Sequence, residues 1–276
     1  MAKISLIISF YNKIELLKLI LVALEEQTLR DFEVIIADDG STLDVVDEIH
    51  RLKDSFSFPI KHVWHEDLGW RKNAILNQAV LASKSDYLVF IDGDCIPHRQ
   101  FLQEHLEFRK ESQVLCGRRV LLTAKVSKKL SAKRIQKRYL GYPVFFDLLW
   151  ETLFCGKKTY LEQMIHLRSK WLRQLVIKER QRYILGCNFS LWKEDILRVN
   201  GFDERFKHPG YGEDIDLEQR LAVMGIPAIS CKCALLIFHV YHVHFDTDYA
   251  PNKALLEENK IHQIAATPFG IHKIEE

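Results

Sequence analysis

The sequence predicts an α/β fold with a mostly parallel central sheet flanked by helices and with a basic helical insertion. Three observations predict this class. Runs of β-forming residues alternate with amphipathic segments through about the first hundred residues, which is typical of a parallel sheet covered by helices. Two of these runs stop abruptly in carboxylates, as strands do at a ligand-binding sheet edge. The chain has 276 residues, 47% hydrophobic and 28% charged, which is enough for one large domain.

The N-terminal elements follow in regular order. The strand-like runs are Lys3–Phe10, Phe32–Ala37, Ile60–Trp64 and Tyr87–Ile91. The helical segments between them are Ile14–Leu24, Asp44–Lys53 and the stretch from Leu68 to Leu81. In the first helix the apolar residues recur at helical spacing, at Ile14, Leu17, Leu21 and Leu24. Because right-handed crossovers connect parallel strands, the strands should all end at one rim of the sheet.

Carboxylates stand where two of these strands end. Asp38-Asp39-Gly40-Ser41 follows the second strand, and Asp92-Gly93-Asp94 follows the fourth. Gly93 permits a tight turn and a close approach to a ligand. Carboxylate, tyrosine and guanidinium groups at one rim could pair with a base, stack on it and bind phosphate, which outlines a nucleotide site. The residues expected to converge there are Tyr11, Asp38, Asp39, Arg71, Asp92 and Asp94.

The Asp92-Gly93-Asp94 turn also suggests a cation. Two carboxylates so close repel each other unless a cation is near, and oxygen ligands suit Mg²⁺ or Mn²⁺. A polar loop with two solvated aspartates is the alternative, and Asp-x-Asp alone favours neither interpretation. The chain has no G-x-G-x-x-G after the first strand and no G-x-x-x-x-G-K-[ST], which argues against a dinucleotide oxidoreductase and a P-loop NTPase.

The C-terminal half carries a second set of candidate residues. Its strand-like runs are Val114–Val120, Tyr183–Trp192 and Leu235–Phe245, and its expected helices are Arg99–Arg109, Lys193–Val199 and Glu213–Met224. Glu213 and Asp214 begin the last helix, where the dipole stabilises acidic groups, so simple capping is the alternative to a catalytic role. The same dipole should keep Asp214 ionised, as a general base requires. Three histidines close together in the last run favour metal binding over a structural role: His239, His242 and His244.

The stretch between these halves is strongly basic. From 118 to 182 there are 17 Lys or Arg residues against 4 acidic residues, although the net charge of the chain is only +2. Tyr142–Cys155 adds a dense apolar and aromatic patch. Together they indicate a surface that meets an anionic membrane or a large acceptor. For any single residue the alternative is a helix that packs on the domain with its lysines in water. Nucleic acid ranks lower, because no nucleic-acid-binding motif accompanies the charge.

Three further features bear on the location of the protein. Its 6 cysteines are scattered and form no Cys-x-x-Cys pair, which fits reduced thiols and argues against a zinc site. The N-terminal apolar run is typical of a first strand rather than of a signal peptide. No uncharged run is long enough to span a membrane. We therefore expect a cytoplasmic protein, either free or attached peripherally to the inner face of the cytoplasmic membrane.

Seven stretches in order resemble an inverting glycosyltransferase of family 2 with the GT-A fold. They are ISLIISFYN, FEVIIADDGS, GWRKNAILNQAV, YLVFIDGDCIP, GCNFSLWKEDILRVNGFDE, YGEDIDLEQRL and FHVYHVH. They span most of the chain except roughly 120–181 and the tail after about Ala250. The Gly-Glu-Asp stretch is also similar to β-1,4-galactosyltransferases and chondroitin-type polymerases. Where the family usually has a proline two residues before the first-strand tyrosine, this chain has Ser9, which affects the exit of the strand rather than the chemistry.

The resemblance implies a single catalytic domain over 1–276. Its parts would be a nucleotide-binding half (1–119), the basic helical insertion (120–182), an acceptor and catalytic half (183–250) and a C-terminal extension (251–276). The extension could be a helix or a loosely packed tail.

The resemblance also implies a donor site. Tyr11 and Asp39 would hold the uracil of a UDP-sugar, and Arg71 would approach the base or the diphosphate. Asp92 would touch the ribose or the metal, and Asp94 would ligate Mn²⁺ or Mg²⁺. The other expected donor-binding residues are Ser9, Gly93, Gly186 and Asn188.

By the same resemblance, Asp214 would be the general base and Glu213 would bind the acceptor. His242 is the favoured second metal ligand, with His239 or His244 as alternates. Together these roles imply transfer of a hexose or N-acetylhexosamine, with inversion, from a UDP-sugar to a hydroxyl of a glycan or a lipid-linked glycan. A bacterial role in lipopolysaccharide or capsule biosynthesis follows from the resemblance and the short single-domain layout.

Two other functions compete with this one. A sugar nucleotidyltransferase usually needs a loop rich in glycine and lysine after the first strand, and ISFYNKIEL is not such a loop. An inactive carbohydrate-binding or membrane-binding module could keep the fold without the activity. The intact Asp-x-Asp, Gly-Glu-Asp and histidine stretches argue against that second alternative.

Overall fold

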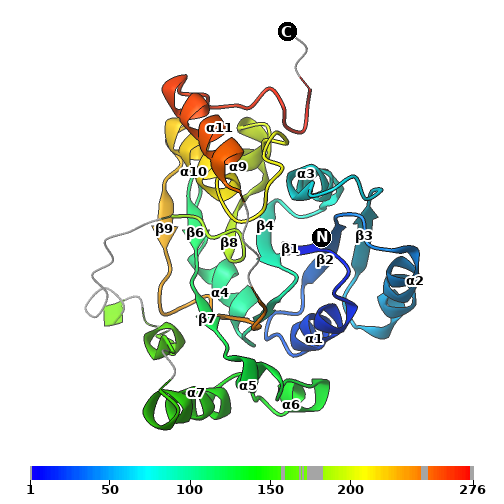
Figure 1. Cartoon of the computed structure of the whole chain (residues 1–276), viewed down its shortest axis with the longest axis vertical. Coiled ribbons are helices and arrows are strands. Elements are labelled where there is room, and N and C mark those ends of the chain that lie inside the picture. Colours follow the sequence, from blue (N-terminus) through cyan, green and yellow to red (C-terminus); the bar gives the residue numbers. More distant parts are fainter. Residues whose placement is uncertain are drawn as a thin grey trace.

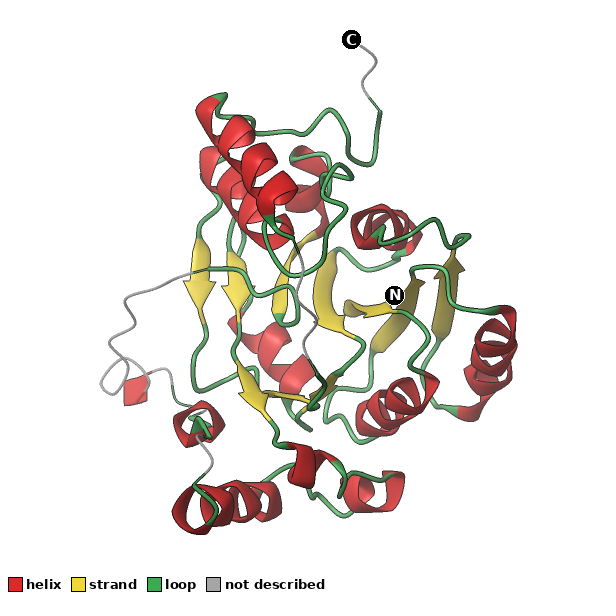
Figure 2. Cartoon of the chain, in the orientation of Figure 1, coloured by secondary structure: helices red, strands yellow, loops and turns green. Residues whose placement is uncertain are grey.

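The computed structural model describes residues 2–156, 159–167, 169, 171–172, 183–243 and 248–273. Its larger sheet has seven strands in the order β3-β2-β1-β4-β8-β6-β9, and Figure 2 shows these strands with helices on both sides of them. The strands of this sheet are β1 (Ile4–Phe10), β2 (Phe32–Asp38), β3 (Ile60–Trp64), β4 (Tyr87–Asp92), β6 (Val114–Cys116), β8 (Phe189–Trp192) and β9 (Ala228–Ser230). A smaller sheet has the order β5-β10-β7, with β5 (Cys95–Pro97), β7 (Arg119–Leu121) and β10 (Ile237–His239). The predicted α/β class is therefore confirmed.

Helices and strands alternate along the chain up to β4. After β7 the order is less regular, with several helices in succession. They are α1 (Ile14–Glu25), α2 (Leu43–Leu52), α3 (Lys72–Ala82), α4 (Phe101–Phe108), α5 (Ala124–Ser127), α6 (Ala132–Gln136), α7 (Tyr142–Phe154), α9 (Lys193–Arg198), α10 (Glu213–Val223) and α11 (Ala250–Ile261). Two short 3₁₀ turns cover Lys53–Ser55 and Leu161–Met164. Among the described residues, no helix is long and apolar enough to cross a membrane.

The parallel strands β1, β2 and β4 are buried on both faces, whereas the edge strand β3 is partly exposed. Strands β1, β2, β3 and β4 run parallel, and β1 pairs with β2 and β4 on its two sides. Leu6 and Ile8 of β1 belong to the core cluster that contains α1, whereas Ile7 belongs to the cluster that contains α3. Successive side chains of a strand point to opposite faces, so a strand covered twice needs the continuous apolar run that the sequence shows.

The C-terminal strands are shorter than the sequence predicted. The run Val114–Val120 divides into β6 in the large sheet and β7 in the small one. Gly117 lies at the division and packs against Asn188, where a Cβ would come within 2.2 Å of the amide. The run Tyr183–Trp192 is a strand only from Phe189, and Leu235–Phe245 only over Ile237–His239. The end of that last run, with His244, lies outside the described residues.

A small helical lobe follows β7. Figure 1 shows α5, α6 and α7 grouped at the end of the molecule farthest from α11. Their inner side chains join the core cluster of α1, through Val126, Ile135, Val144 and Leu148. The described part of the predicted insertion is therefore helical and anchored on the domain.

The chain after 250 packs on the domain as a helix and a connecting segment. Asn259 of α11 donates its side-chain amide to Asp216 of α10, 2.7 Å away. Thr267 donates its hydroxyl to Asp203 at 2.8 Å, and Arg205 pairs with Asp203 at 2.7 Å. These buried contacts hold α10, and with it the Glu213–Asp214 pair, in a fixed place.

Candidate functional site

A cleft of about 810 Å³ opens at the carboxyl ends of β1, β2 and β4. Right-handed crossovers bring these three strand ends to one rim, as the sequence predicted. The start of α10 and the segment after β10 form other parts of its wall. The predicted site residues that line it are Ser9, Tyr11, Asp39, Asp92, Gly93, Asp94, Gly186, Glu213, Asp214, His239 and His242.

One end of the cleft has a carboxylate held between two polar partners. Asp39 lies 2.7 Å from the Nε2 atom of His65 and accepts the backbone N–H of Arg71 at 2.9 Å. Burial raises the pKa of Asp39, against the lowering effect of these two partners. The Tyr11 ring is half exposed, and its hydroxyl donates to Asp67 at 2.9 Å. A planar ring beside an oriented acceptor is suited to a nucleobase.

Three predicted residues do not line the cleft. Asp38 is fully buried and bonds Ser41 and His62, which fixes the turn after β2. Arg71 contributes its backbone amide to Asp39, but its side chain is not part of the cleft wall. Asn188 is fully buried and donates to the carbonyls of Arg118 and Leu235, at 3.0 and 2.7 Å. Asn188 therefore links the starts of the two segments that lead into β7 and β10.

Lys72 provides a cation that the sequence analysis did not assign. Its Nζ atom lies 2.9 Å from Asp92 inside the cleft. Burial alone would lower the pKa of Lys72, but the carboxylates of Asp92, Asp214 and Glu213 outweigh it, so the pKa rises and the ammonium stays charged. Lys72 follows Arg71 directly and is the first residue of α3. The sequence alone therefore does not show which of these two neighbouring side chains enters the cleft.

His65 and Asp67 were not among the predicted site residues, although the sequence contains a signal for them. Both lie in the connection that leaves β3. The rule that placed Asp39 and Asp94 at the rim applies equally to this strand, because β3 runs parallel to β2.

The turn after β4 lies in close contact with β1. Gly93 has the carbonyl of Ser9 so near that a Cβ would approach that oxygen to 2.8 Å. Ser9 is also paired in register with Asp92. A glycine is therefore required between the two aspartates, and it lets both carboxylates face the cleft.

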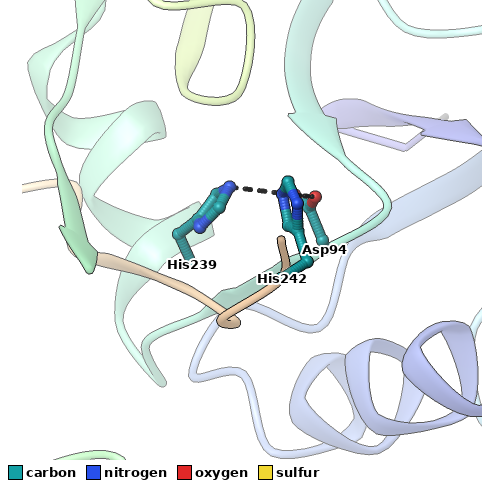
Figure 3. A group of neighbouring side chains, drawn as sticks. All are labelled: Asp94, His239 and His242. Carbon is teal, nitrogen blue, oxygen red and sulfur yellow. Dashed lines mark ion pairs between the residues drawn. The ribbon is translucent and has the colours of Figure 1, made fainter. Parts of the chain in front are cut away.

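Asp94, His239 and His242 line the cleft and form a cluster (Figure 3). Their candidate ligand atoms all lie within 4.8 Å of one another. The Nε2 atoms of His242 and His239 are 3.1 and 3.6 Å from the Asp94 carboxylate. Antiparallel pairing sets His239 opposite Cys95, and Val240 donates its N–H to the Asp94 carbonyl at 2.9 Å. Sheet pairing thus brings residues far apart in sequence to one point.

Glu213 and Asp214 enter the cleft from the first turn of α10. Asp214 accepts the backbone N–H of Gly186 at 2.7 Å. Burial, together with the neighbouring Glu213, raises the pKa of Asp214 to about 7. The expected stabilisation of the ionised form by the helix dipole is therefore outweighed by burial. Burial also raises the pKa of Glu213, although Lys72 opposes that shift.

Two protein-family models together match most of the chain. Residues 5–175 match glycosyl transferase family 2, and residues 168–244 match a family described as the N-terminal domain of galactosyltransferase.

Among sequence relatives, chondroitin synthase of Escherichia coli is 28% identical over 225 residues, 79% of this chain and 32% of that protein. Validoxylamine A glucosyltransferase of Streptomyces hygroscopicus subsp. jinggangensis is 30% identical over 237 residues, 81% of this chain and 52% of that protein. The chain thus spans between about a third and about half of the length of these relatives.

Solved structures show the same fold at lower identity. The mannosyltransferase PcManGT of Pyrobaculum calidifontis, solved with GDP-Man and Mn²⁺, has a TM-score of 0.55 at 17% identity, over 86% of this chain and 56% of that one. TarS of S. aureus has a TM-score of 0.53 at 16% identity, over 87% of this chain and 37% of that one. The family match covers more than half of the residues and the solved structures share the fold, so the chain belongs to glycosyl transferase family 2 and has the GT-A fold.

Proposed function

We propose that this chain is a metal-dependent inverting glycosyltransferase that moves a sugar from a UDP-sugar to a hydroxyl of a glycan or lipid-linked glycan acceptor. The transferred sugar would be a hexose or N-acetylhexosamine, and the role would lie in bacterial lipopolysaccharide or capsule biosynthesis. One observation carries the proposal: the Asp94–His239–His242 cluster and the Asp214 carboxylate face one cleft of about 810 Å³. The proposed site for the leaving diphosphate, at the Asp94–His239–His242 cluster, and the proposed general base, Asp214, therefore line the same cleft.

The part of the cleft around Asp39 and Tyr11 is suited to the uracil of a nucleotide. Asp39 would accept a base N–H, and the exposed Tyr11 ring would stack on the base. His65 and the Arg71 amide hold the Asp39 carboxylate in place before the ligand arrives. Ser9 and Gly93 would let the nucleotide approach the backbone closely, and Gly186 would lie beside the donor sugar. Lys72, between Asp92 and the α10 carboxylates, adds a positive charge that suits a diphosphate.

The donor set fits a divalent cation. Asp94, His239 and His242 would hold it through one carboxylate and two imidazoles, with Asp92 nearby. Coordinating histidines must be neutral, and burial lowers the pKa of His239, which favours that form. Mg²⁺ prefers oxygen ligands, so the two imidazoles favour Mn²⁺. Such an ion would neutralise the charge that develops on the leaving diphosphate.

The start of α10 supplies a candidate general base. Asp214 is oriented by the Gly186 amide and has a pKa of about 7, so at neutral pH it can accept a proton from an attacking hydroxyl. Glu213 beside it would bind the acceptor sugar. The hydroxyl attacks the anomeric carbon as the bond to UDP breaks, and its proton passes to Asp214. A single displacement inverts this carbon, so an α-linked donor gives a β-linked product.

A panel of UDP-sugars tests the proposal without knowledge of the acceptor. UDP release by slow donor hydrolysis is measured for each sugar, with Mn²⁺ and with a chelator. We expect consumption of a UDP-sugar only in the presence of the metal. Failure of every sugar, combined with no binding of UDP and Mn²⁺, would overturn the proposal.

A further inference from the structure

The outward face of α7 is aromatic and apolar. Tyr142, Phe146, Trp150, Leu153 and Phe154 are each between 57% and 84% exposed in the described structure. Their spacing of about four residues aligns them on one side of the helix. The rings of Trp150 and Phe154 lie 4.2 Å apart and form a continuous patch. Apolar patches of this kind mark interaction surfaces.

The opposite face of α7 fixes this orientation. Val144 and Leu148 are buried in the main core, so the helix cannot turn its aromatic side inward without exposing them. Asp147 accepts hydrogen bonds from Lys129 at 2.5 Å and from Tyr139, which attaches α7 to the segment around α6. The exposed face is therefore a set feature of the fold.

The surface of the neighbouring helices is uniformly positive. The exposed cations on or beside α5 and α6 are Lys125, Lys128, Lys133, Arg134, Lys137 and Arg138. Between 120 and 156 the chain has two carboxylates, and neither offsets this charge. Asp147 is paired with Lys129, and Glu151 is buried.

We propose that α5, α6 and the exposed face of α7 form a docking surface for an anionic lipid bilayer. The aromatic side chains enter the headgroup region, and the cations contact lipid phosphates. Tyr and Trp are suited to the membrane interface because their rings are apolar with a polar edge. Stable peripheral attachment requires two signals, and this lobe offers apolar insertion and a basic patch together. A second copy fits less well, because a symmetric contact would bring two positive faces together.

The docking surface is connected directly to the cleft. The N–H of Leu122 donates to the His239 carbonyl at 3.0 Å, just before α5 begins. The N–H of Tyr241 donates to the Ser127 hydroxyl at 3.0 Å. Membrane attachment would thus hold the segment with His239 and His242 near the bilayer. If the proposed glycosyl transfer holds, this position favours a lipid-linked acceptor, but docking itself does not depend on that activity.

Vesicle cosedimentation tests the docking surface. Vesicles of phosphatidylcholine are compared with vesicles that contain about a third phosphatidylglycerol, an anionic fraction that attracts basic segments. We expect binding to the anionic vesicles alone, reduced by salt. Lys125→Gln/Lys133→Gln/Lys137→Gln should weaken partition about a hundredfold, at about fivefold per charge. Phe146→Ala/Trp150→Ala should abolish the salt-resistant part.

Matched controls lie elsewhere on the surface. Lys84→Gln/Lys110→Gln/Lys260→Gln removes the same charge, and Leu43→Ala/Ile261→Ala removes exposed apolar side chains. Thermal unfolding shows that each variant is folded, independently of any UDP-sugar activity. The proposal is overturned if wild type ignores anionic vesicles or if the controls lose as much binding. Association of the chain with itself that Phe146→Ala/Trp150→Ala abolishes, without vesicle binding, would identify an interface between copies instead.

Discussion

Asp214 shows how one side chain can be prepared for proton transfer by its surroundings. The Gly186 amide orients it, and burial raises its pKa to about 7. Gly186 is so close that a Cβ there would lie 2.4 Å from the carboxylate, so only glycine can provide this contact without a shift. The sequence indicated the role of Asp214 through Gly-Glu-Asp, but the pKa depends on packing that local sequence does not reveal.

Asp214→Asn is the sharpest change at this position. The amide keeps the size of the side chain but cannot take up the proton of the attacking hydroxyl. We expect kcat to fall by about 10²–10⁴-fold, the usual contribution of general-base catalysis, while UDP binding with Mn²⁺ is retained. Steady-state kinetics with the donor found by the panel measure this. Retained turnover would remove Asp214 from the role of base.

The pH dependence of kcat/KM tests the same carboxylate in the intact protein. A base must be deprotonated, so a raised pKa shifts the loss of activity upward from the ordinary range of an aspartate. We expect kcat/KM to fall as the pH decreases through about 7 and to level off above it. A profile that stays flat from pH 7 down to about 5 would mean that Asp214 titrates near its usual value.

At single positions, the hardest feature to predict was which of two neighbouring side chains lies in the cleft. The sequence favoured Arg71 for the nucleotide, yet Lys72 is the side chain that reaches Asp92 in the cleft. Arg71 precedes α3 in a non-helical conformation and does not line the cleft, whereas Lys72 is the first residue of the helix and does. His239 was an alternate ligand, yet it lies with His242 beside Asp94 because β10 pairs with β5.

At the level of elements, the parallel strands were predicted within one residue. A strand covered on both faces must be apolar throughout, and such runs are visible in the sequence without any partner. The prediction merged β6 and β7 into one strand and made β8 and β10 too long, because apolar residues next to these short strands are buried by loops rather than by sheet pairing. Val240, for example, is buried but follows the end of β10.

Asn188 tests whether a residue expected at the donor site serves the fold instead. Its amide joins the carbonyls of Arg118 and Leu235 in the interior. Asn188→Ala should lower the free energy of unfolding by about 1–3 kcal/mol, because it leaves buried carbonyls without a donor. Denaturant unfolding measures this, with Asn252→Ala, which removes a similar buried pair of bonds at Tyr211 and His208, as the matched variant.

The direct donor-binding prediction for Asn188 has a different signature. Loss of a donor contact would raise the KM for the UDP-sugar without changing stability. A variant with unchanged unfolding and a raised KM would therefore contradict the structural role.

At the level of the whole molecule, the fold brings together two halves that sequence could only identify separately. The donor-side residues come from the ends of parallel strands, which topology places at one rim. His239, His242, Glu213 and Asp214 come from elements that are far along the chain, and the resemblance to family 2 supplied the expectation that they meet there. The basic lobe matched none of the seven stretches. The sequence indicated its charge and its aromatic patch, but only the structure shows which side chains of α7 are exposed and which are buried.

Binding of UDP in the presence and absence of Mn²⁺ tests the central claim most directly, because it needs neither the donor sugar nor the acceptor. Calorimetric titration of wild type, Asp94→Ala and Asp214→Asn gives the comparison. We predict metal-dependent UDP binding in wild type and Asp214→Asn, and its loss in Asp94→Ala. Equal UDP binding with Mn²⁺ and with a chelator, or unchanged binding in Asp94→Ala, would contradict a metal-assisted UDP site at Asp94, His239 and His242.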